Sequence, residues 1–255
     1  MEEKFKEQAI IIRQEEIADD IYSMWLHTEN IATHAKPGQF INVYCNDGSR
    51  ILPRPISICE IDRADQALRM VYRKQGKGTA EFSTLHTGDI LNVTGPLGNG
   101  FPKKAKKAFL IGGGIGIPPM LQLAKELDCE KQIVLGFRDE LFLLEEFEAQ
   151  GKVYIATEDG SYGTKGNVLN AIEANGLTAD IIYACGPSPM LRALKQYAAE
   201  HKMECWISME ERMACGIGAC LACVCQSKNR DEHSNVNNKR VCVEGPVFRA
   251  EEVEF

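Results

Sequence analysis

The chain has 255 residues, a formal net charge of -7 and 44% hydrophobic residues. This length allows two domains and a small third module, and the acidic balance argues against a nucleic-acid binder, which needs a basic stripe to neutralise phosphates. The N-terminus is charged, with no apolar signal segment, and the longest apolar run, residues 108–121, is too short to span a bilayer. We therefore expect a cytoplasmic protein that binds neither nucleic acid nor membrane.

Residues 1–102 are predicted to form an antiparallel six-stranded β-barrel. Apolar segments rich in Ile, Val, Tyr and Phe are separated there by turn signals, a spacing typical of a barrel or sandwich. The expected strands are residues 5–14, 21–28, 39–45, 56–61, 67–73 and 89–95. A short helix over residues 79–85, with Thr79 as its N-cap, is expected to interrupt them.

Residues 103–208 are predicted to form a doubly wound parallel α/β sheet, because strand-like and helix-like segments alternate along them. The expected strands are residues 107–114, 132–138, 152–159, 180–186 and 203–208. The expected helices are one that starts at Pro118-Pro119 and three more over residues 141–150, 166–176 and 187–201. Lys103 to Lys107 form the only basic run, which we interpret as a solvated linker.

Residues 209–255 are predicted to form a small cysteine-rich module. Cys215, Cys220, Cys223 and Cys242 have the C-x4-C-x2-C spacing, with a distant fourth cysteine, of a plant-ferredoxin-type [2Fe-2S] loop. Small residues between the ligands would let the backbone wrap closely around a cluster. The spacing therefore predicts an iron–sulfur site.

Three other uses of these cysteines stay open: a structural zinc site, a disulfide framework and buried free thiols. Zinc sites usually have two short Cys-x2-Cys clips, whereas only Cys220 and Cys223 form one here. Disulfides would require an oxidising compartment. Cys225 lies in an extended segment and points the same way as Cys223, so it is either a supporting thiol or a substitute ligand.

Three shorter motifs suggest sites for nucleotide cofactors. The sequence RPIS at residues 54–57 offers an arginine fork and a serine hydroxyl, and GKGT at residues 76–79 is a glycine turn that leads into a helix. The glycines of residues 112–116 lie between a strand and a helix, where a phosphate-binding turn is expected. Cys185 ends another strand at the same edge of the sheet, where a small buried side chain is the ordinary alternative.

Taken together, these motifs resemble the ferredoxin–NADP reductase superfamily. Within it, the chain is most similar to the electron-transfer subunits of class 1B dihydroorotate dehydrogenases. The matching stretches are residues 54–57, 76–79, 112–119, 185–191 and 215–225, and the RVCVEGPVF ending at residues 240–248. The resemblance spans the whole chain, and its specificity comes from the order and spacing of the motifs.

The resemblance implies FAD in the barrel, NAD(H) on the sheet and a [2Fe-2S] cluster in the C-terminal module. It implies FAD contacts from Arg54, Pro55, Ile56, Ser57, Val71, Tyr72, Arg73, Gly78 and Thr79. It implies nicotinamide-nucleotide contacts from Gly113, Gly114 and Gly116, and cluster ligation by Cys215, Cys220, Cys223 and Cys242. Ser57 would lie near the reactive edge of the flavin, and Cys185 would lie beside the nicotinamide ring.

The implied function is an electron relay in pyrimidine biosynthesis, from the FMN of a dihydroorotate dehydrogenase catalytic subunit to NAD+. The implied complex is a heterotetramer with two copies of each subunit. Asp139 and Glu140 follow the second strand of the sheet, where an acid disfavours the 2′-phosphate of NADPH.

Two alternatives remain. Related subunits of ferredoxin-linked NADPH oxidoreductases and hydrogenases share this layout, although some have aspartate at one cluster position, where this chain has cysteine throughout. The second alternative is a non-catalytic interaction module stabilised by zinc.

Overall fold

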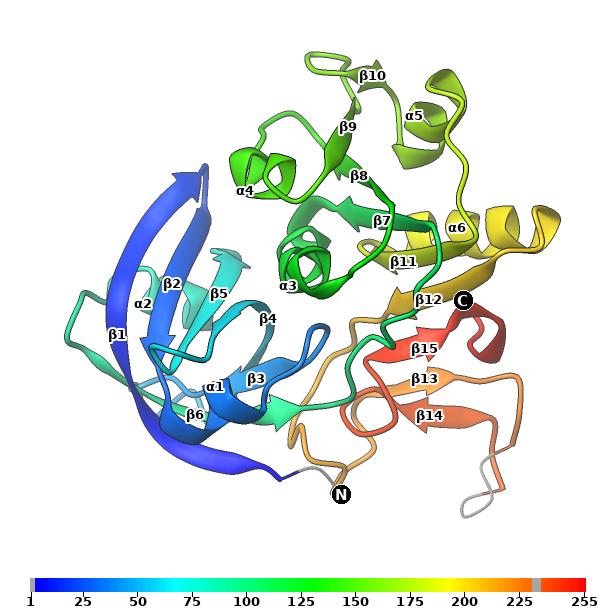
Figure 1. Ribbon diagram of the computed structural model, residues 1–255. Coiled ribbons are helices and arrows are strands. Elements are labelled where there is room, and N and C mark those ends of the chain that lie inside the picture. The colour runs from blue at the N-terminus through cyan, green and yellow to red at the C-terminus, as the bar shows by residue number, and fades with distance from the viewer. Residues whose placement is uncertain (1–2, 231–234) are drawn as a thin grey trace.

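The computed structural model describes residues 3–230 and 235–255. Residues 1–2 of the predicted first domain and residues 231–234 of the predicted third lie outside the described residues. A barrel, a parallel sheet and a cysteine-rich segment follow one another along the chain, and the cysteine-rich segment lies beside both of the others (Figure 1). Among the described residues, no helix is long and apolar enough to cross a membrane.

The N-terminal part is a closed six-stranded antiparallel barrel, as predicted, with the strand order β1-β2-β5-β4-β3-β6. Its strands are β1 (Phe5–Ala18), β2 (Ile21–His27), β3 (Phe40–Val43), β4 (Arg54–Asp62), β5 (Ala67–Arg73) and β6 (Ile90–Leu97). Side chains alternate along β1, where Ala9 and Ile11 are buried while Ile10 and Ile12 are exposed. This alternation allows the sheet to close around one apolar core.

Two short helices accompany the barrel. The first, α1 (Glu29–His34), is absent from the sequence-based prediction and is capped by Thr28, whose Oγ1 accepts a hydrogen bond from the Ala32 N–H at 3.2 Å. The second is α2 (Lys77–Phe82), and the prediction that Thr79 caps it is wrong. Gly76 is the N-cap, and the Thr79 hydroxyl accepts a hydrogen bond from the Gly76 N–H at 3.1 Å, as the third residue of a capping box does.

The second part is a seven-stranded sheet with the order β10-β9-β8-β7-β11-β12-β15, in which only β15 is antiparallel to its neighbour. Its strands are β7 (Ala108–Gly113), β8 (Lys131–Phe137), β9 (Lys152–Thr157), β10 (Thr164–Lys165), β11 (Ile181–Cys185), β12 (Glu204–Ser208) and β15 (Val247–Arg249). The short η1 helix (Gly114–Gly116) follows β7, and the α-helices are α3 (Pro118–Glu126), α4 (Leu144–Glu148), α5 (Val168–Ala174) and α6 (Ser188–Glu200). Helices α3 and α4 cover one face and α5 and α6 the other, so the predicted doubly wound architecture is confirmed (Figure 1).

The C-terminal segment forms the hairpin β13 (Val224–Gln226) and β14 (Asn238–Arg240), then β15 and the short helix η2 (Ala250–Glu252). Strand β15 pairs with β12, with Ile207 opposite Phe248. The cysteine-rich segment is therefore continuous with the sheet. The division of the chain at 102/103 and 208/209 stays a prediction.

The barrel packs against the sheet through α3, whose Gln122 side chain accepts a hydrogen bond from the Ile61 N–H at 2.8 Å. A buried ion pair joins Arg69 to Glu60 at 2.6 Å, and Arg69 also reaches Glu146 of α4 at 3.2 Å. The linker lysines are likewise paired, since Lys103, Lys104, Lys106 and Lys107 each contact a carboxylate of the sheet domain. These polar contacts fix the orientation of the barrel against the sheet.

Candidate functional site

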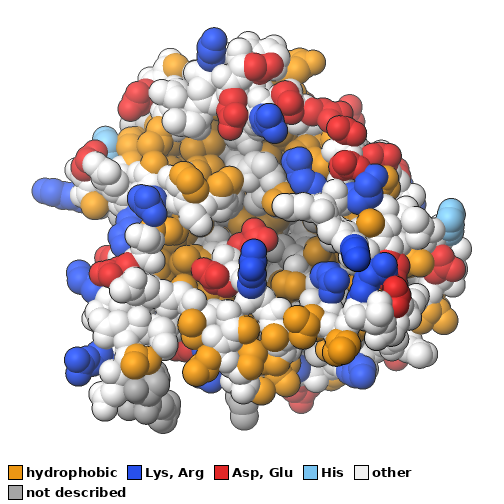
Figure 2. All heavy atoms as spheres, turned by 180° about the vertical axis from the view of Figure 1, so that it is seen from behind, with side chains coloured by type: hydrophobic (Ala, Val, Ile, Leu, Met, Phe, Trp, Pro, Cys, Tyr) orange, Lys and Arg blue, Asp and Glu red, His pale blue; other side chains and the backbone are white. Residues whose placement is uncertain are grey.

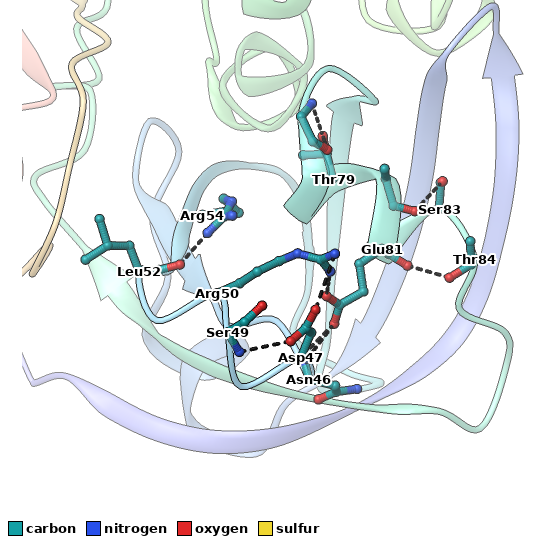
Figure 3. Close-up of polar contacts among 12 residues, drawn as sticks. Asn46, Asp47, Ser49, Arg50, Leu52, Arg54, Thr79, Glu81, Ser83 and Thr84 are labelled. Carbon is teal, nitrogen blue, oxygen red and sulfur yellow. Dashed lines mark hydrogen bonds and ion pairs between the residues drawn. The ribbon is translucent and has the colours of Figure 1, made fainter.

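Arg54 is the first residue of β4, and its side chain lies against the first turn of α2 (Figure 3). Its guanidinium donates to the Leu52 carbonyl, and a Cβ atom at Gly78 would lie only 2.2 Å from Arg54 Nε. Glycine at position 78 therefore lets the arginine fork approach the helix. A guanidinium beside a helix start is suited to a pyrophosphate, so these residues fit the phosphate part of FAD.

Arg50 and Glu81 support this arrangement, and the sequence motifs did not reveal either residue. Arg50 forms an ion pair with Glu81 of α2, and the Asp47 N–H donates to the same carboxylate at 3.2 Å (Figure 3). Burial raises the pKa of Glu81. The hydrogen bonds from the Asn46 and Asp47 N–H groups and the charge of Arg50 lower it by more, so the net pKa lies below the ordinary value. The charged carboxylate thus holds the β3–β4 loop against α2. The partners are 31 residues apart, so no local pattern signals them.

Val71, Tyr72 and Arg73 lie at the end of β5 and point in different directions. Tyr72 is buried in the barrel, its hydroxyl donates to Gln14 at 2.9 Å, and burial raises its pKa. Val71 belongs to the apolar core shared with the sheet domain. Only the side chain of Arg73 is exposed, so Val71 and Tyr72 could contact a ligand at this edge only through their backbone.

A cleft of about 260 Å³ separates the barrel from the carboxyl edge of the sheet. Arg73 and Gly114, both predicted cofactor contacts, line it from opposite sides together with Asp139. Glu140 also borders the cleft, where its carboxylate accepts a hydrogen bond from the Asp19 N–H at 2.9 Å. Figure 2 shows that the molecule seen from behind is hollowed near the centre of its face, with charged side chains of both signs around the hollow.

The three predicted glycines of the nucleotide turn lie at the end of β7 and in η1. A Cβ atom at Gly113 would lie 2.6 Å from Met190 Sδ, and one at Gly116 would lie 2.5 Å from the Cys185 carbonyl oxygen. Gly114 has φ +52 and open space beside it. Two glycines thus allow close packing, and the third leaves room for a ligand at the sheet edge, where nucleotides bind in this architecture.

Cys185 ends β11 between two neighbours in the sheet, opposite Gly112 of β7 and Ser208 of β12. Burial raises its pKa to about 12, so the thiol stays protonated at neutral pH. An uncharged, polarisable side chain at this edge can pack against a flat aromatic ring without adding charge.

Cys215 and Cys220 form the first pair of sulfurs in the cysteine loop. The Cys220 thiol lies 3.3 Å from Cys215 Sγ, which also accepts hydrogen bonds from the N–H groups of Cys220 at 3.4 Å and Ile217 at 3.5 Å. Burial raises the pKa of Cys215, but these donors prevail and lower it to about 6. Gly216 and Gly218 have φ +67 and +84, conformations that favour glycine. The loop is therefore shaped to hold a thiolate.

Cys223 and Cys242 form the second pair. The Cys242 N–H donates to Cys223 Sγ at 3.4 Å, and both residues are buried. Burial and the adjacent Cys223 side chain raise the pKa of Cys242 to about 12. All ten cysteines of the chain are free, which excludes a disulfide framework in this structure.

The paired arrangement fits two metal ions better than one. A tetrahedral zinc ion needs four sulfurs roughly 3.8 Å apart, as its bond lengths require. Within residues 3–230 and 235–255, the only group of three or more potential ligand atoms within 4.8 Å of one another is Glu16, Asp19 and Asp20, on the barrel. No three cysteine sulfurs meet this condition. Two pairs of thiolates, one for each iron, match the requirement of a [2Fe-2S] cluster.

Cys225 lies apart from both pairs, on β13. It is buried, and burial raises its pKa to about 11. Its neighbours across the hairpin are backbone groups of Lys239. These contacts favour a supporting thiol over a ligand.

Comparison with known proteins agrees with this geometry. Residues 210–254 match a family model described as the iron–sulfur cluster binding domain of dihydroorotate dehydrogenase B. A protein of Geobacillus sp. (strain WCH70), named dihydroorotate dehydrogenase B (NAD(+)), electron transfer subunit, is 44% identical over 97% of this chain and 98% of its own. A protein of the same name from Caldanaerobacter subterraneus subsp. tengcongensis is 42% identical over 99% and 100% of the two chains.

Solved structures show the same fold. A chain from the NADH-dependent reduced ferredoxin–NADP oxidoreductase, a structure concerned with flavin-based electron bifurcation, matches with a TM-score of 0.87 and 31% identity over 97% of this chain and 90% of that chain. A ferredoxin NADP+ reductase from Neisseria gonorrhoeae matches with a TM-score of 0.60 and 17% identity over 76% and 91%, a likeness of fold alone. Because the similarity to the named subunits covers nearly the whole of each chain, this chain belongs to the family of dihydroorotate dehydrogenase B (NAD(+)) electron transfer subunits.

Proposed function

We propose that this chain is the electron-transfer subunit of an NAD-dependent dihydroorotate dehydrogenase, and that it passes electrons from the FMN of a catalytic subunit to NAD+ in pyrimidine biosynthesis. The observation that carries this proposal is the contact of the cysteine loop with the barrel. Asn42 of β3 donates a hydrogen bond to the Cys215 carbonyl at 3.2 Å, and β3 pairs with β4, the strand of Arg54 and Ser57. When bound, a [2Fe-2S] cluster, FAD and NAD(H) supply single-electron transfer, a link between one- and two-electron steps, and hydride exchange.

On the barrel, Arg54, Gly78 and Thr79 would hold the phosphates of FAD at the start of α2. Pro55 and Ile56 would support the flavin along β4. Ser57 lies opposite Phe40, which packs in the core shared with the cysteine loop, so its hydroxyl is on the side of the barrel that faces the cluster ligands. This position suits a hydroxyl that donates to the reactive edge of the ring.

On the sheet, Gly114 would leave room for the nucleotide, and Gly113 and Gly116 would keep the turn tight against β11. Cys185 would lie beside the nicotinamide as a neutral thiol, since burial holds its pKa at about 12. Val71, Tyr72 and Arg73 would complete the flavin side of the cleft, the first two through their backbone. Cys215, Cys220, Cys223 and Cys242 would ligate the cluster.

The FMN-containing partner would dock on the outer surface of the cysteine loop, in a cytoplasmic heterotetramer with two copies of each subunit. Ile217, Leu221 and Val243 are large apolar side chains around the ligands, and all three are exposed. Exposed apolar side chains beside a redox site suit a protein interface, because burial on binding removes them from water. A partner at this surface would come close to the cluster.

A second candidate is the FAD/[2Fe-2S] subunit of a ferredoxin-linked NADPH oxidoreductase. The structural match at 31% identity supports it, because that chain comes from such an enzyme. The higher identity to the dihydroorotate dehydrogenase subunits favours the first candidate.

Co-expression with the FMN-dependent dihydroorotate-oxidising protein of the same organism tests the proposal. We expect a stable complex that contains FMN, FAD and iron and reduces NAD+ when dihydroorotate is added. A chain that binds no such partner, yet reduces ferredoxin with NADPH, would establish the second candidate instead.

A further inference from the structure

Asn42 is a fully buried polar residue in an apolar strand. Ile41 and Val43, its neighbours on β3, point into the barrel core, whereas Phe40 packs in the other core, with Cys223 and Cys242. Asn42 shares the outward face with Phe40, because side chains alternate along a strand. Its cross-strand partner is Pro55 of β4. The residue thus lies between the strand assigned to FAD and the cysteine loop.

The side chain of Asn42 is in close contact with the first cluster ligand. Its Nδ2 donates to the Cys215 carbonyl at 3.2 Å, and a Cβ atom at Gly216 would lie only 2.3 Å from the same nitrogen. Gly216 is therefore required for this approach. The contact joins two residues that are 173 positions apart in the chain.

The contact leaves one polar atom of Asn42 without a partner. Asn42 Oδ1 is buried and has no hydrogen bond among the described residues. An unpaired buried acceptor costs stability, and an apolar residue of similar shape would avoid that cost. The asparagine is thus poorly explained as a stabilising core residue, and its one hydrogen bond goes to the peptide of Cys215.

We infer that Asn42 is a positioning residue for electron transfer, which holds the Cys215–Gly216 peptide at a fixed place relative to the flavin strand. The inference rests on the proposed function. The donated hydrogen bond fixes the carbonyl of Cys215, and with it the direction of the neighbouring N–H groups and of the Cys215 sulfur. Because β3 is paired directly with β4, a shift of this peptide changes the separation of the cluster from the flavin.

The test is Asn42→Leu in the holoprotein, which removes both the donor and the unpaired acceptor with little change of shape. We expect the fold and the reduction of FAD by NADH to be unchanged. Reduction of the cluster should slow relative to the wild type, because the Cys215 peptide is no longer held at a fixed distance from the flavin strand. The electron paramagnetic resonance spectrum of the reduced cluster should shift in its g values, which a merely structural role would not alter.

Asn99→Leu is the matched control. Asn99 also joins the barrel region to the C-terminal segment, but all its polar atoms are paired: Nδ2 donates to the Glu244 and Val247 carbonyls at 3.0 and 2.9 Å, and Oδ1 accepts from the Val247 N–H at 3.0 Å. This variant should lower the melting temperature while it keeps the wild-type resonance spectrum. If the leucine variant does not fold, Asn42→Ser takes its place, because the smaller serine side chain cannot clash. The serine variant should show the same shift in g values.

The outcomes separate the two proposals. A wild-type chain without a cluster overturns both the relay and the role of Asn42. A wild-type chain with a cluster, together with Asn42→Leu and Asn42→Ser variants that match it in spectrum and in cluster reduction rate, overturns the role of Asn42 alone.

Discussion

At the scale of single residues, contacts between the cysteines distinguish the four proposed ligands from Cys225. The pKa values do not, because burial raises the pKa of the proposed ligand Cys242 to about 12. Cys215 accepts several hydrogen bonds that lower its pKa to about 6, as a metal-binding thiolate needs. Burial raises the pKa of Cys225 to about 11, and its neighbour across the hairpin is Lys239, whereas the Cys242 N–H donates to Cys223 Sγ at 3.4 Å. The C-x4-C-x2-C spacing alone left the role of Cys225 open, because spacing says nothing about hydrogen-bond donors.

We predict that Cys223→Ser abolishes the cluster and leaves FAD bound, because it removes one of the two ligands of an iron. Cys225→Ser is the matched control, two residues away, and should keep the cluster. Iron analysis and the visible spectrum measure both. Full iron content in the first variant, or iron loss in the second, would show that the ligand set is assigned wrongly.

A second residue-scale prediction concerns Gly78. In Gly78→Ala the new methyl group would displace the Arg54 guanidinium, which is the flexible end of its side chain. The apoprotein should therefore keep its stability, while FAD affinity falls about ten-fold, as expected when a charge-assisted contact is lost. Gly76→Ala is the control, because nothing lies within 4 Å of its added Cβ. Flavin fluorescence titration measures the affinity, and equal values for the two variants would contradict the role of Arg54.

At the scale of elements, the sequence allowed the barrel and the alternating sheet to be predicted, since apolar periodicity records which side of a strand is buried. It did not reveal α1, whose apolar residues are few, or β15, whose place beside β12 depends on a contact across about forty residues of chain. It placed the start of α2 wrongly, because Thr79 is a cap-like residue that acts at the third helical position. Local chemistry identified Arg54 and the glycine turns. The Arg50–Glu81 and Asn42–Cys215 pairs are tertiary contacts that no local motif encodes.

The loop after β8 yields a prediction about cofactor choice. Asp139 and Glu140 both line the cleft. The Asp139 carboxylate accepts a hydrogen bond from the adjacent Glu140 N–H at 2.9 Å and stays within the loop, whereas the Glu140 carboxylate is bound to the barrel by the Asp19 N–H at 2.9 Å. An acid there repels a 2′-phosphate, so kcat/KM should be higher for NADH than for NADPH by at least about ten-fold. Asp139→Asn should narrow this ratio more than Glu140→Gln. Faster turnover of NADPH by the wild-type chain would refute the assignment.

The linker and β12 yield a prediction about pH. Burial raises the pKa of Glu204, but Lys104, Trp206 and Lys106 outweigh it and lower the pKa to about 2. A lowered pKa means that the charged carboxylate stabilises the fold above the ordinary value of 4.5, and that this stabilisation is lost as the pH falls toward 2. Glu204→Gln should therefore reduce the free energy of unfolding by about 1 kcal/mol at pH 7.

Denaturant titrations at several pH values check the effect of Glu204→Gln, and the difference from the wild type should shrink below pH 4.5. Glu130→Gln is the control, because the Glu130 side chain is exposed in its ion pair with Lys107, and exposed carboxylates contribute little to stability through such pairs. A difference that stays constant from pH 7 to acid would contradict the role of the Glu204 charge.

At the scale of the whole molecule, three parts are packed together so that their candidate sites keep fixed positions relative to one another. One apolar core contains Phe40 of β3, the sheet face under α5 and α6, and the cysteines of the second pair. A second core joins the barrel to the sheet face under α3 and α4, with the buried Arg69–Glu60 pair beside it. The flavin strand, the nucleotide turn and the cysteine loop thus belong to one packed body, which suits a chain that passes electrons between them.

The most direct test is an anaerobic titration of the purified chain with NADH, followed by visible and electron paramagnetic resonance spectroscopy and by metal analysis. We expect FAD bleaching, a resonance signal from a reduced [2Fe-2S] cluster and about two iron atoms per chain. A chain with a single zinc ion, or with iron that NADH does not reduce while the flavin bleaches, would contradict the electron relay.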